Sequence, residues 1–132
     1  MSPSSLLYRQ ISPSWLAADG TSTSQAFRPT PKDEGLLSSY DGDLISPKEA
    51  WIFHTTQLAA LVGKEGQFAS LGIQALSRQE LTAEKLPVIE DRQPFPEHLS
   101  IDFRDLTKKD VERIAQRLKA AAHARGWLFR GA

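Results

Sequence analysis

His54 is the residue whose place in the sequence most clearly suggests chemistry. Residues on a helix turn by about 100° each, so His54 would lie within roughly 80° of Ala50, Leu58 and Leu61 on one apolar face. An imidazole on a buried face needs a hydrogen-bond partner. It can be a core histidine that bonds a backbone carbonyl, or a histidine at the floor of a cleft that acts as an acid, a base or a ligand contact. Both interpretations remain open at this point.

Arg9 is the second candidate, because it lies in a short segment with the alternation of a strand. In residues 5–11, Leu7, Arg9 and Ile11 would point to the same side, so Arg9 has apolar neighbours. A guanidinium in such surroundings needs an anionic partner. The partner can be a ligand phosphate or carboxylate held by two hydrogen bonds. It can also be structural, in which case the candidates are Asp33, Asp41, Asp91 and Asp102.

A polar segment with little periodicity follows the first expected strands. Residues 28–43 combine charged side chains with prolines and glycines, which predicts a long polar loop. Loops longer than about 12–15 residues are uncommon in compact domains and are often functional. We therefore expect an ordered recognition loop, in which Arg28 and Lys32 offer cationic donors to an anionic group.

Tyr40, in the same segment, completes the predicted set of ligand-binding residues. Its ring is expected to pack against Trp51 or His54. The full set is Arg9, Arg28, Lys32, Tyr40 and His54.

The common signatures of metal and cofactor enzymes are absent. The chain has no cysteine, which excludes thiol nucleophiles and zinc sites with thiolate ligands. It has no phosphate-binding P-loop, no GxGxxG, no HExxH and no GxSxG. The spacing of His54, His98 and His123 places no two of them on one helix face. We expect no cofactor and no metal, and these patterns do not decide whether the protein is an enzyme.

The order of three short patches suggests a family. Arg9 on the first expected strand is followed by the Ser-Thr-Ser patch at residues 22–24, and later by a glutamate that could be Glu80, Glu84 or Glu90. This order resembles that of the mono-ADP-ribosyltransferases and their small toxin relatives. The resemblance implies that Arg9 and Ser22 hold NAD and that Glu90 stabilises the transferring ribose.

Two segments carry the capping residues of helices. Ser46, with Glu49 three residues later, predicts a helix over residues 46–62. Thr107 begins a second predicted helix over residues 107–125. From these helices we expect six core residues: Trp51, Phe53, Leu58, Leu61, Ile114 and Leu118.

Short apolar segments bounded by turn residues predict the strands. A helical turn is expected at residues 13–15 and a short helix at residues 77–85. Helices of unequal length among short strands favour an α+β fold, with a small, mostly antiparallel sheet packed by the two main helices. The predicted strands are residues 5–11, 22–27, 68–76, 86–90, 98–103 and 127–130.

Length and composition are those of one globular domain. The chain has 132 residues, of which 40% are hydrophobic and 24% charged, so we expect a frayed start at residues 1–4 and a single domain over residues 5–132. The formal net charge is zero, so nucleic acid is not expected as a partner. No apolar run approaches the roughly 18 residues of a membrane span, which predicts a cytoplasmic protein without a membrane partner.

Two functions fit these observations. The first is a small binding or protein-interaction module, in which the 28–43 loop recognises an anionic group on a ligand or a protein partner. The alternative is a small NAD- or nucleotide-dependent transferase, or a hydrolase, that uses Arg9 with Ser22 or His54 and a carboxylate. A deep pocket that holds Arg9, Arg28 and His54 together would favour the enzyme, and internal pairing of these groups would favour the module.

Overall fold

The computed structural model describes residues 2–131, so Met1 and Ala132, at the ends of the predicted frayed start and domain, lie outside the described residues. Residues 2–5 form a turn, in which the Ser5 amide donates to the Ser2 carbonyl at 3.1 Å. The chain then forms a six-stranded sheet with the order β4-β5-β2-β1-β3-β6. The strands are β1 (Leu6–Gln10), β2 (Leu36–Asp41), β3 (Gly72–Ser77), β4 (Val88–Ile89), β5 (His98–Asp102) and β6 (Phe129–Arg130).

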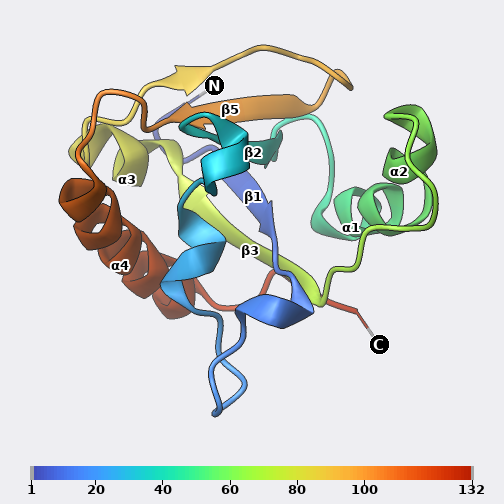
Figure 1. Ribbon diagram of the computed structural model, residues 1–132, viewed down its shortest axis with the longest axis horizontal. Coiled ribbons are helices and arrows are strands. Elements are labelled where there is room, and N and C mark those ends of the chain that lie inside the picture. The colour runs from blue at the N-terminus through green and yellow to red at the C-terminus, as the bar shows by residue number, and fades with distance from the viewer. Residues whose placement is uncertain (1, 132) are drawn as a thin grey trace.

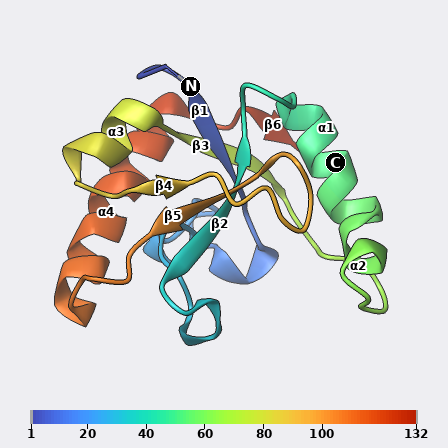
Figure 2. The same cartoon turned by 90° about the horizontal axis from the view of Figure 1, so that it is seen from above.

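Helices cover both faces of this sheet (Figures 1 and 2). They are α1 (Pro47–Thr56), α2 (Leu58–Leu61), α3 (Arg78–Ala83) and α4 (Lys108–Arg125). Figure 2 shows α3 and α4 on one side and α1 and α2 on the other. Because successive side chains of a strand point to opposite faces, β1 sends Leu7 into the core beneath α4 and Tyr8 into the core beneath α1. Every pairing in the sheet is antiparallel, so the predicted α+β class is confirmed.

The predicted helix over residues 107–125 is confirmed as α4. The Thr107 hydroxyl accepts the Asp110 amide at 3.2 Å, which satisfies one of the free N–H groups of the first turn. Gly126 follows the last turn with φ of 85°, a conformation that favours glycine. Ile114 and Leu118 are buried against the sheet, as predicted.

The predicted helix over residues 46–62 is present but divided, and one core prediction fails with it. The helical turns of α1 end at Thr56, and α2 starts after Gln57, whose backbone lies outside the helical region. The hydroxyl of Thr56 donates to the Ile52 carbonyl at 2.5 Å, a local bond that tends to bend helices. Beyond this break Leu61 is 54% exposed, so its predicted core position is wrong. Trp51, Phe53 and Leu58 are partly buried and pack against the core beneath α1.

The prediction of one long loop over residues 28–43 is wrong for its second half, which is strand β2 in the middle of the sheet. Ser38, Ser39 and Asp41 hide this strand in the sequence, because they break the apolar alternation. The two buried members have polar partners: Ser39 donates to the Leu99 carbonyl at 3.3 Å, and Asp41 pairs with Arg92. The first half of the segment holds only a short 3-10 turn, η3 (Pro31–Asp33).

The predicted strand over residues 22–27 is also wrong. These residues form a 3-10 helix, η2 (Ser24–Phe27), and Ser22 makes only an isolated bridge to Leu16. Phe27 is fully buried in the core beneath α4, so tertiary burial overrides the extended pattern here.

The remaining predicted elements are present. The turn at residues 13–15 is a 3-10 helix, η1 (Pro13–Trp15), and the short helix is α3, with a capping box between Ser77 and Glu80. Residues 129–130 form β6 at the sheet edge, paired with β3. In the described part of the chain, no helix has the length and apolar character needed to cross a bilayer.

Candidate functional site

Arg9 lies at the point where β1 and β2 separate. The ladder between these strands ends at the pair of Tyr8 and Tyr40. Beyond it the Arg9 side chain fills the space, with Nε donating to the Ala26 carbonyl at 2.7 Å and Nη1 donating to the Ser38 carbonyl. The guanidinium is therefore fixed by backbone oxygens from two other segments, which leaves its remaining nitrogen, Nη2, for another partner.

No carboxylate in the described part of the chain forms an ion pair with Arg9, although the charge of Asp33 partly offsets the effect of burial on the Arg9 pKa. Within residues 2–131, no Asp or Glu oxygen lies within 4.0 Å of its guanidinium. Arg9 is 8% exposed, and burial lowers its pKa to about 10, a value that still leaves it charged near neutral pH. The four carboxylates considered as structural partners are engaged elsewhere: Asp33 caps η3, Asp41 pairs with Arg92, Asp91 with His98 and Asp102 with Arg104.

Arg9 lines a cavity of about 240 Å³ between the sheet and the α1–α2 side of the domain. The Trp15 ring lies beside the guanidinium, with its centroid 5.6 Å from the Arg9 Cζ. Tyr40 and His54 line the same cavity, so three of the five predicted ligand-binding residues meet here. The other apolar walls come from Leu58, Val62, Phe68 and Phe95.

His54 and Tyr40 form a neutral pair at this pocket. The Tyr40 hydroxyl lies 2.9 Å from His54 Nδ1, which confirms the predicted contact between the two rings. Burial raises the pKa of Tyr40, and burial together with the charge of Arg9 lowers the pKa of His54 to about 4. Near neutral pH the tyrosine therefore keeps its proton and donates it to Nδ1. The second ring nitrogen of His54, Nε2, then carries the imidazole proton.

Two N–H donors of the pocket are free to bind a ligand. In residues 2–131, neither Arg9 Nη2 nor His54 Nε2 has a hydrogen-bond partner. No fully buried side-chain nitrogen or oxygen in that range lacks a partner, so each of these two atoms keeps some accessible surface. Both residues line the cavity, which makes the cavity the place where a bound group would meet these donors.

The neutral state of His54 predicts a loss of stability in mild acid. Its folded pKa of about 4 lies below the ordinary value of 6.5, so between these values the unfolded chain binds a proton that the folded protein does not. Stability should fall as the pH drops, by about 1–2 kcal/mol near pH 5 after allowance for partial exposure. Urea denaturation at neutral pH and near pH 5 would measure this. The variant His54→Gln should lose less than the wild type, and equal losses would contradict the burial of His54.

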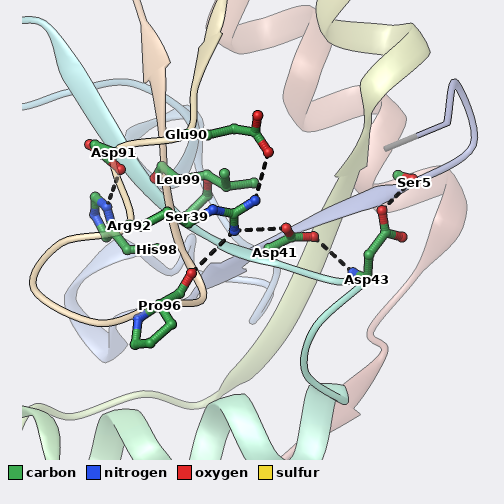
Figure 3. A network of polar contacts seen from close by, with 10 residues as sticks. All are labelled: Ser5, Ser39, Asp41, Asp43, Glu90, Asp91, Arg92, Pro96, His98 and Leu99. Atoms are coloured by element: carbon green, nitrogen blue, oxygen red, sulfur yellow. Dashed lines mark hydrogen bonds and ion pairs between the residues drawn. The ribbon is translucent and has the colours of Figure 1, made fainter.

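A second group of polar residues reaches the cavity from β2, β5 and the segment before β5. His98 Nδ1 lies 2.7 Å from Asp91 Oδ1, as Figure 3 shows, and its Nε2 lies 3.1 Å from the Ser38 hydroxyl. Ser100 donates to the other Asp91 oxygen at 2.5 Å. Burial by itself would raise the pKa of Asp91, but hydrogen bonds from Ser100 and His98 lower it, so the carboxylate stays ionised. Ser38 is exposed, His98 is buried, and both line the cavity.

Arg92 fixes the segment that carries this group (Figure 3). Its Nη1 donates to Asp41 Oδ2 at 2.8 Å and to the Pro96 carbonyl at 3.2 Å, and its Nη2 donates to Glu90 Oε1 at 2.7 Å. Asp41 is 3% exposed, so the acidic partner of this ion pair is buried. The segment over residues 90–97, which supplies part of the cavity wall, is thereby tied to the central strand β2.

Arg28 and Lys32 do not join the other predicted residues. Arg28 lies 3.6 Å from Glu112 of α4 and lines a separate, open groove of about 760 Å³. Lys32 is exposed on η3 and lines neither this groove nor the cavity. A single pocket with Arg9, Arg28 and His54, which would have favoured the enzyme, is therefore not formed, because the cavity is lined by Arg9 and His54 without Arg28.

The residues that suggested a mono-ADP-ribosyltransferase do not converge. Ser22 donates to Gln74 at 2.6 Å and lies 2.8 Å from His123 Nε2, so it is engaged in the core beneath α4. Of this set, Arg9 alone lines the 240 Å³ cavity. Each glutamate is paired with an arginine: Glu80 with Arg125, Glu84 with Arg117 and Glu90 with Arg92.

Comparison with known proteins identifies no relative. No protein family, no curated protein and no solved structure matches the chain. The function must therefore be argued from the pocket itself.

Sequence reasoning missed four polar residues that line the pocket: Gln10, Ser12, Ser38 and His98. Ser38 was assigned to the loop, and His98 was considered only as a metal ligand. The alternation of polar and apolar residues in β5 was the available signal, because His98 and Ser100 fall on one face and Leu99 on the other. Two adjacent buried polar positions on one strand face require partners, which here are Asp91 and Ser38.

Proposed function

We propose that the protein binds a small organic anion, a carboxylate or a phosphate, in the cavity lined by Arg9, Tyr40 and His54. One observation carries this proposal: Arg9 is a buried guanidinium without a carboxylate partner, and it borders a cavity. A buried charge without an ionic partner is expensive, and structures keep one when it serves a ligand or a mechanism. The bidentate geometry of arginine suits a carboxylate or phosphate group.

The shape and lining of the cavity narrow the ligand class. Its volume of about 240 Å³ is below the roughly 300–1,000 Å³ that is usual for sites of drug-sized ligands, so the ligand is small. Trp15, Phe68 and Phe95 give it aromatic walls, which favour a flat or apolar body behind the anionic group. Arg9 would hold the anion, and the neutral His54 Nε2–H would donate one further hydrogen bond.

Benzoate is a suitable probe, because it joins a carboxylate to a flat ring, and neutral benzamide is its matched control. We expect calorimetric titration to show binding of benzoate and at least about tenfold weaker binding of benzamide, since a hydrogen bond to a charged group contributes about 1.5–3 kcal/mol. This comparison uses the wild-type protein, so it does not depend on the folding of any variant. Equal affinity for the two probes, or no binding of benzoate, would contradict the proposal.

The variant Arg9→Gln tests the same point from the protein side. It should weaken benzoate binding by at least about tenfold, because the amide keeps part of the backbone contacts but lacks the charge. Arg28→Gln is the matched control, because Arg28 is the predicted anion-binding residue that lines the other groove. Circular dichroism and the unfolding midpoint establish that each variant is folded. If Arg28→Gln weakens binding and Arg9→Gln does not, the site has been placed in the wrong cavity.

A further inference from the structure

We propose that Ser38, His98 and Asp91 form a nucleophile, base and orienting carboxylate that hydrolyse a small ester bound in the Arg9 pocket. The inference rests on the proposed function, because Arg9 would hold a carboxylate of the ester. The arrangement is defined by two contacts: Ser38 Oγ to His98 Nε2 at 3.1 Å, and His98 Nδ1 to Asp91 Oδ1 at 2.7 Å. These are the contacts that a serine nucleophile requires, irrespective of the fold or of the order of the residues in the chain.

The hydrogen bonds fix the direction in which a proton would move. Asp91 is ionised and can only accept, so His98 Nδ1 must carry a proton and donate it to the carboxylate. In the neutral imidazole, Nε2 then has a free lone pair, which accepts the hydroxyl proton of Ser38. This tautomer is the one that a general base needs.

The positions of the three side chains also suit these roles. Ser38 is exposed on β2 between the buried residues Leu37 and Ser39, so its hydroxyl is accessible to a ligand. An exposed serine hydroxyl can form its hydrogen bonds with water, so its stability does not require a histidine partner. A serine nucleophile does require one, because a base must take its proton. His98 is buried, which shields the base from bulk solvent. Asp91 is held on its other oxygen by Ser100 at 2.5 Å.

The backbone of Ser38 is tied directly to the proposed anion site. Arg9 Nη1 donates to the Ser38 carbonyl, so the guanidinium that would hold the substrate carboxylate also fixes the residue that would attack. Both residues line the cavity, together with His54, whose Nε2–H would bond a simple anion and, with an ester bound, would face the developing oxyanion instead. The substrate class is therefore a short ester that carries a carboxylate.

The reaction balances with the ester and water as its reactants. Ser38 Oγ attacks the ester carbonyl carbon while His98 Nε2 takes the hydroxyl proton. The bond from the carbonyl carbon to the alcohol oxygen breaks, His98 returns the proton to that oxygen, and the alcohol leaves. Water then attacks the acyl carbon on Ser38, His98 takes a proton from the water, and the Ser38 oxygen regains it as the acid departs.

Two measurements on the full chain test the inference. Phenylmethylsulfonyl fluoride should add one sulfonyl group to the protein, located on Ser38 by peptide mass spectrometry. The mono-4-nitrophenyl ester of glutaric acid should be hydrolysed, and Ser38→Ala should lower its kcat/KM by at least about 100-fold. The matched control is Ser14→Ala, because Ser14 is an exposed serine outside the cavity and bonds only the nearby Ser12. Because Ser38 is exposed, water can replace its hydroxyl as the partner of His98 Nε2, so Ser38→Ala should fold, and circular dichroism and the unfolding midpoint check this.

Asp91 is a positioning residue in this account, so its variant needs a readout that a structural role would not change. Asp91→Asn should lower kcat by at least about 100-fold with little change in KM, because the amide can hold the wrong tautomer of His98. A purely structural role would lower the unfolding midpoint and leave kcat per folded molecule unchanged.

The outcomes separate this inference from the binding proposal. If Ser38→Ala binds benzoate like the wild type but neither hydrolyses the ester nor reacts with the sulfonyl fluoride, both proposals are supported. If the wild type binds benzoate but shows no turnover and no label on Ser38, the hydrolytic inference is overturned and the binding proposal stands. Labelling of another serine, or unchanged turnover in Ser38→Ala, would also overturn it. If benzoate does not bind while Ser38 is labelled, the binding proposal fails instead.

Discussion

The variant Leu118→Ala is expected to lower the free energy of unfolding by about 2–5 kcal/mol. Leu118 is 1% exposed and lies on the face of α4 that packs against the sheet, in the same core as Leu7 and Leu76. Removing three carbon atoms there loses apolar burial and leaves a cavity that close-packed neighbours fill only in part. Urea denaturation followed by circular dichroism measures the change.

Gln116→Ala is the matched control for this change, because Gln116 lies on the exposed side of the same helix. Its free energy of unfolding should stay within about 0.5 kcal/mol of the wild type. A loss of less than about 1 kcal/mol in Leu118→Ala would show that α4 does not pack on the sheet in this way.

Arg92→Gln should destabilise the protein by about 2–4 kcal/mol, the second large effect that the structure predicts. Among residues 2–131, the substitution leaves the Asp41 carboxylate, 3% exposed, with only the Asp43 amide at 2.9 Å as a partner. Breaking a buried pair on one side leaves an uncompensated charge, which is why the effect exceeds that of a surface ion pair. The contact of Arg92 with the Pro96 carbonyl is lost as well, so the segment over residues 90–97 loses an anchor.

Two further variants isolate the cause. Arg113→Gln breaks an exposed pair with Asp110 on α4 and should change the stability by less than about 1 kcal/mol. Adding Asp41→Asn to Arg92→Gln removes the buried charge and should restore part of the lost stability. If the double variant is less stable than Arg92→Gln alone, the unpaired carboxylate is not the reason for the loss.

The helices of this fold could be predicted because their ends are encoded locally. Ser46 and Thr107 accept the amides of Glu49 and Asp110, and both bonds are visible as sequence spacings. Strand β2 could not be predicted in the same way. Its polar residues are satisfied by β5 and Arg92, which are distant in sequence, so the local pattern has the composition of a loop.

The candidate site was predictable only in part, for a similar reason. Arg9 and His54 are conspicuous because each is a polar side chain in an apolar pattern, and such residues need partners. The sequence left open whether Arg9 pairs with a carboxylate. The answer depends on which partners the four candidate aspartates find in the folded protein. Arg28 and Arg9 are separated in the structure because η2 places Arg28 beside α4 instead of over the end of the sheet.

A crystal of the protein soaked with benzoate tests the binding site most directly. We expect the carboxylate within hydrogen-bond distance of the Arg9 guanidinium, with the ring between Trp15, Phe68 and Phe95. A benzoate bound in the groove beside Arg28, or an empty cavity at a concentration that saturates binding in solution, would contradict this expectation.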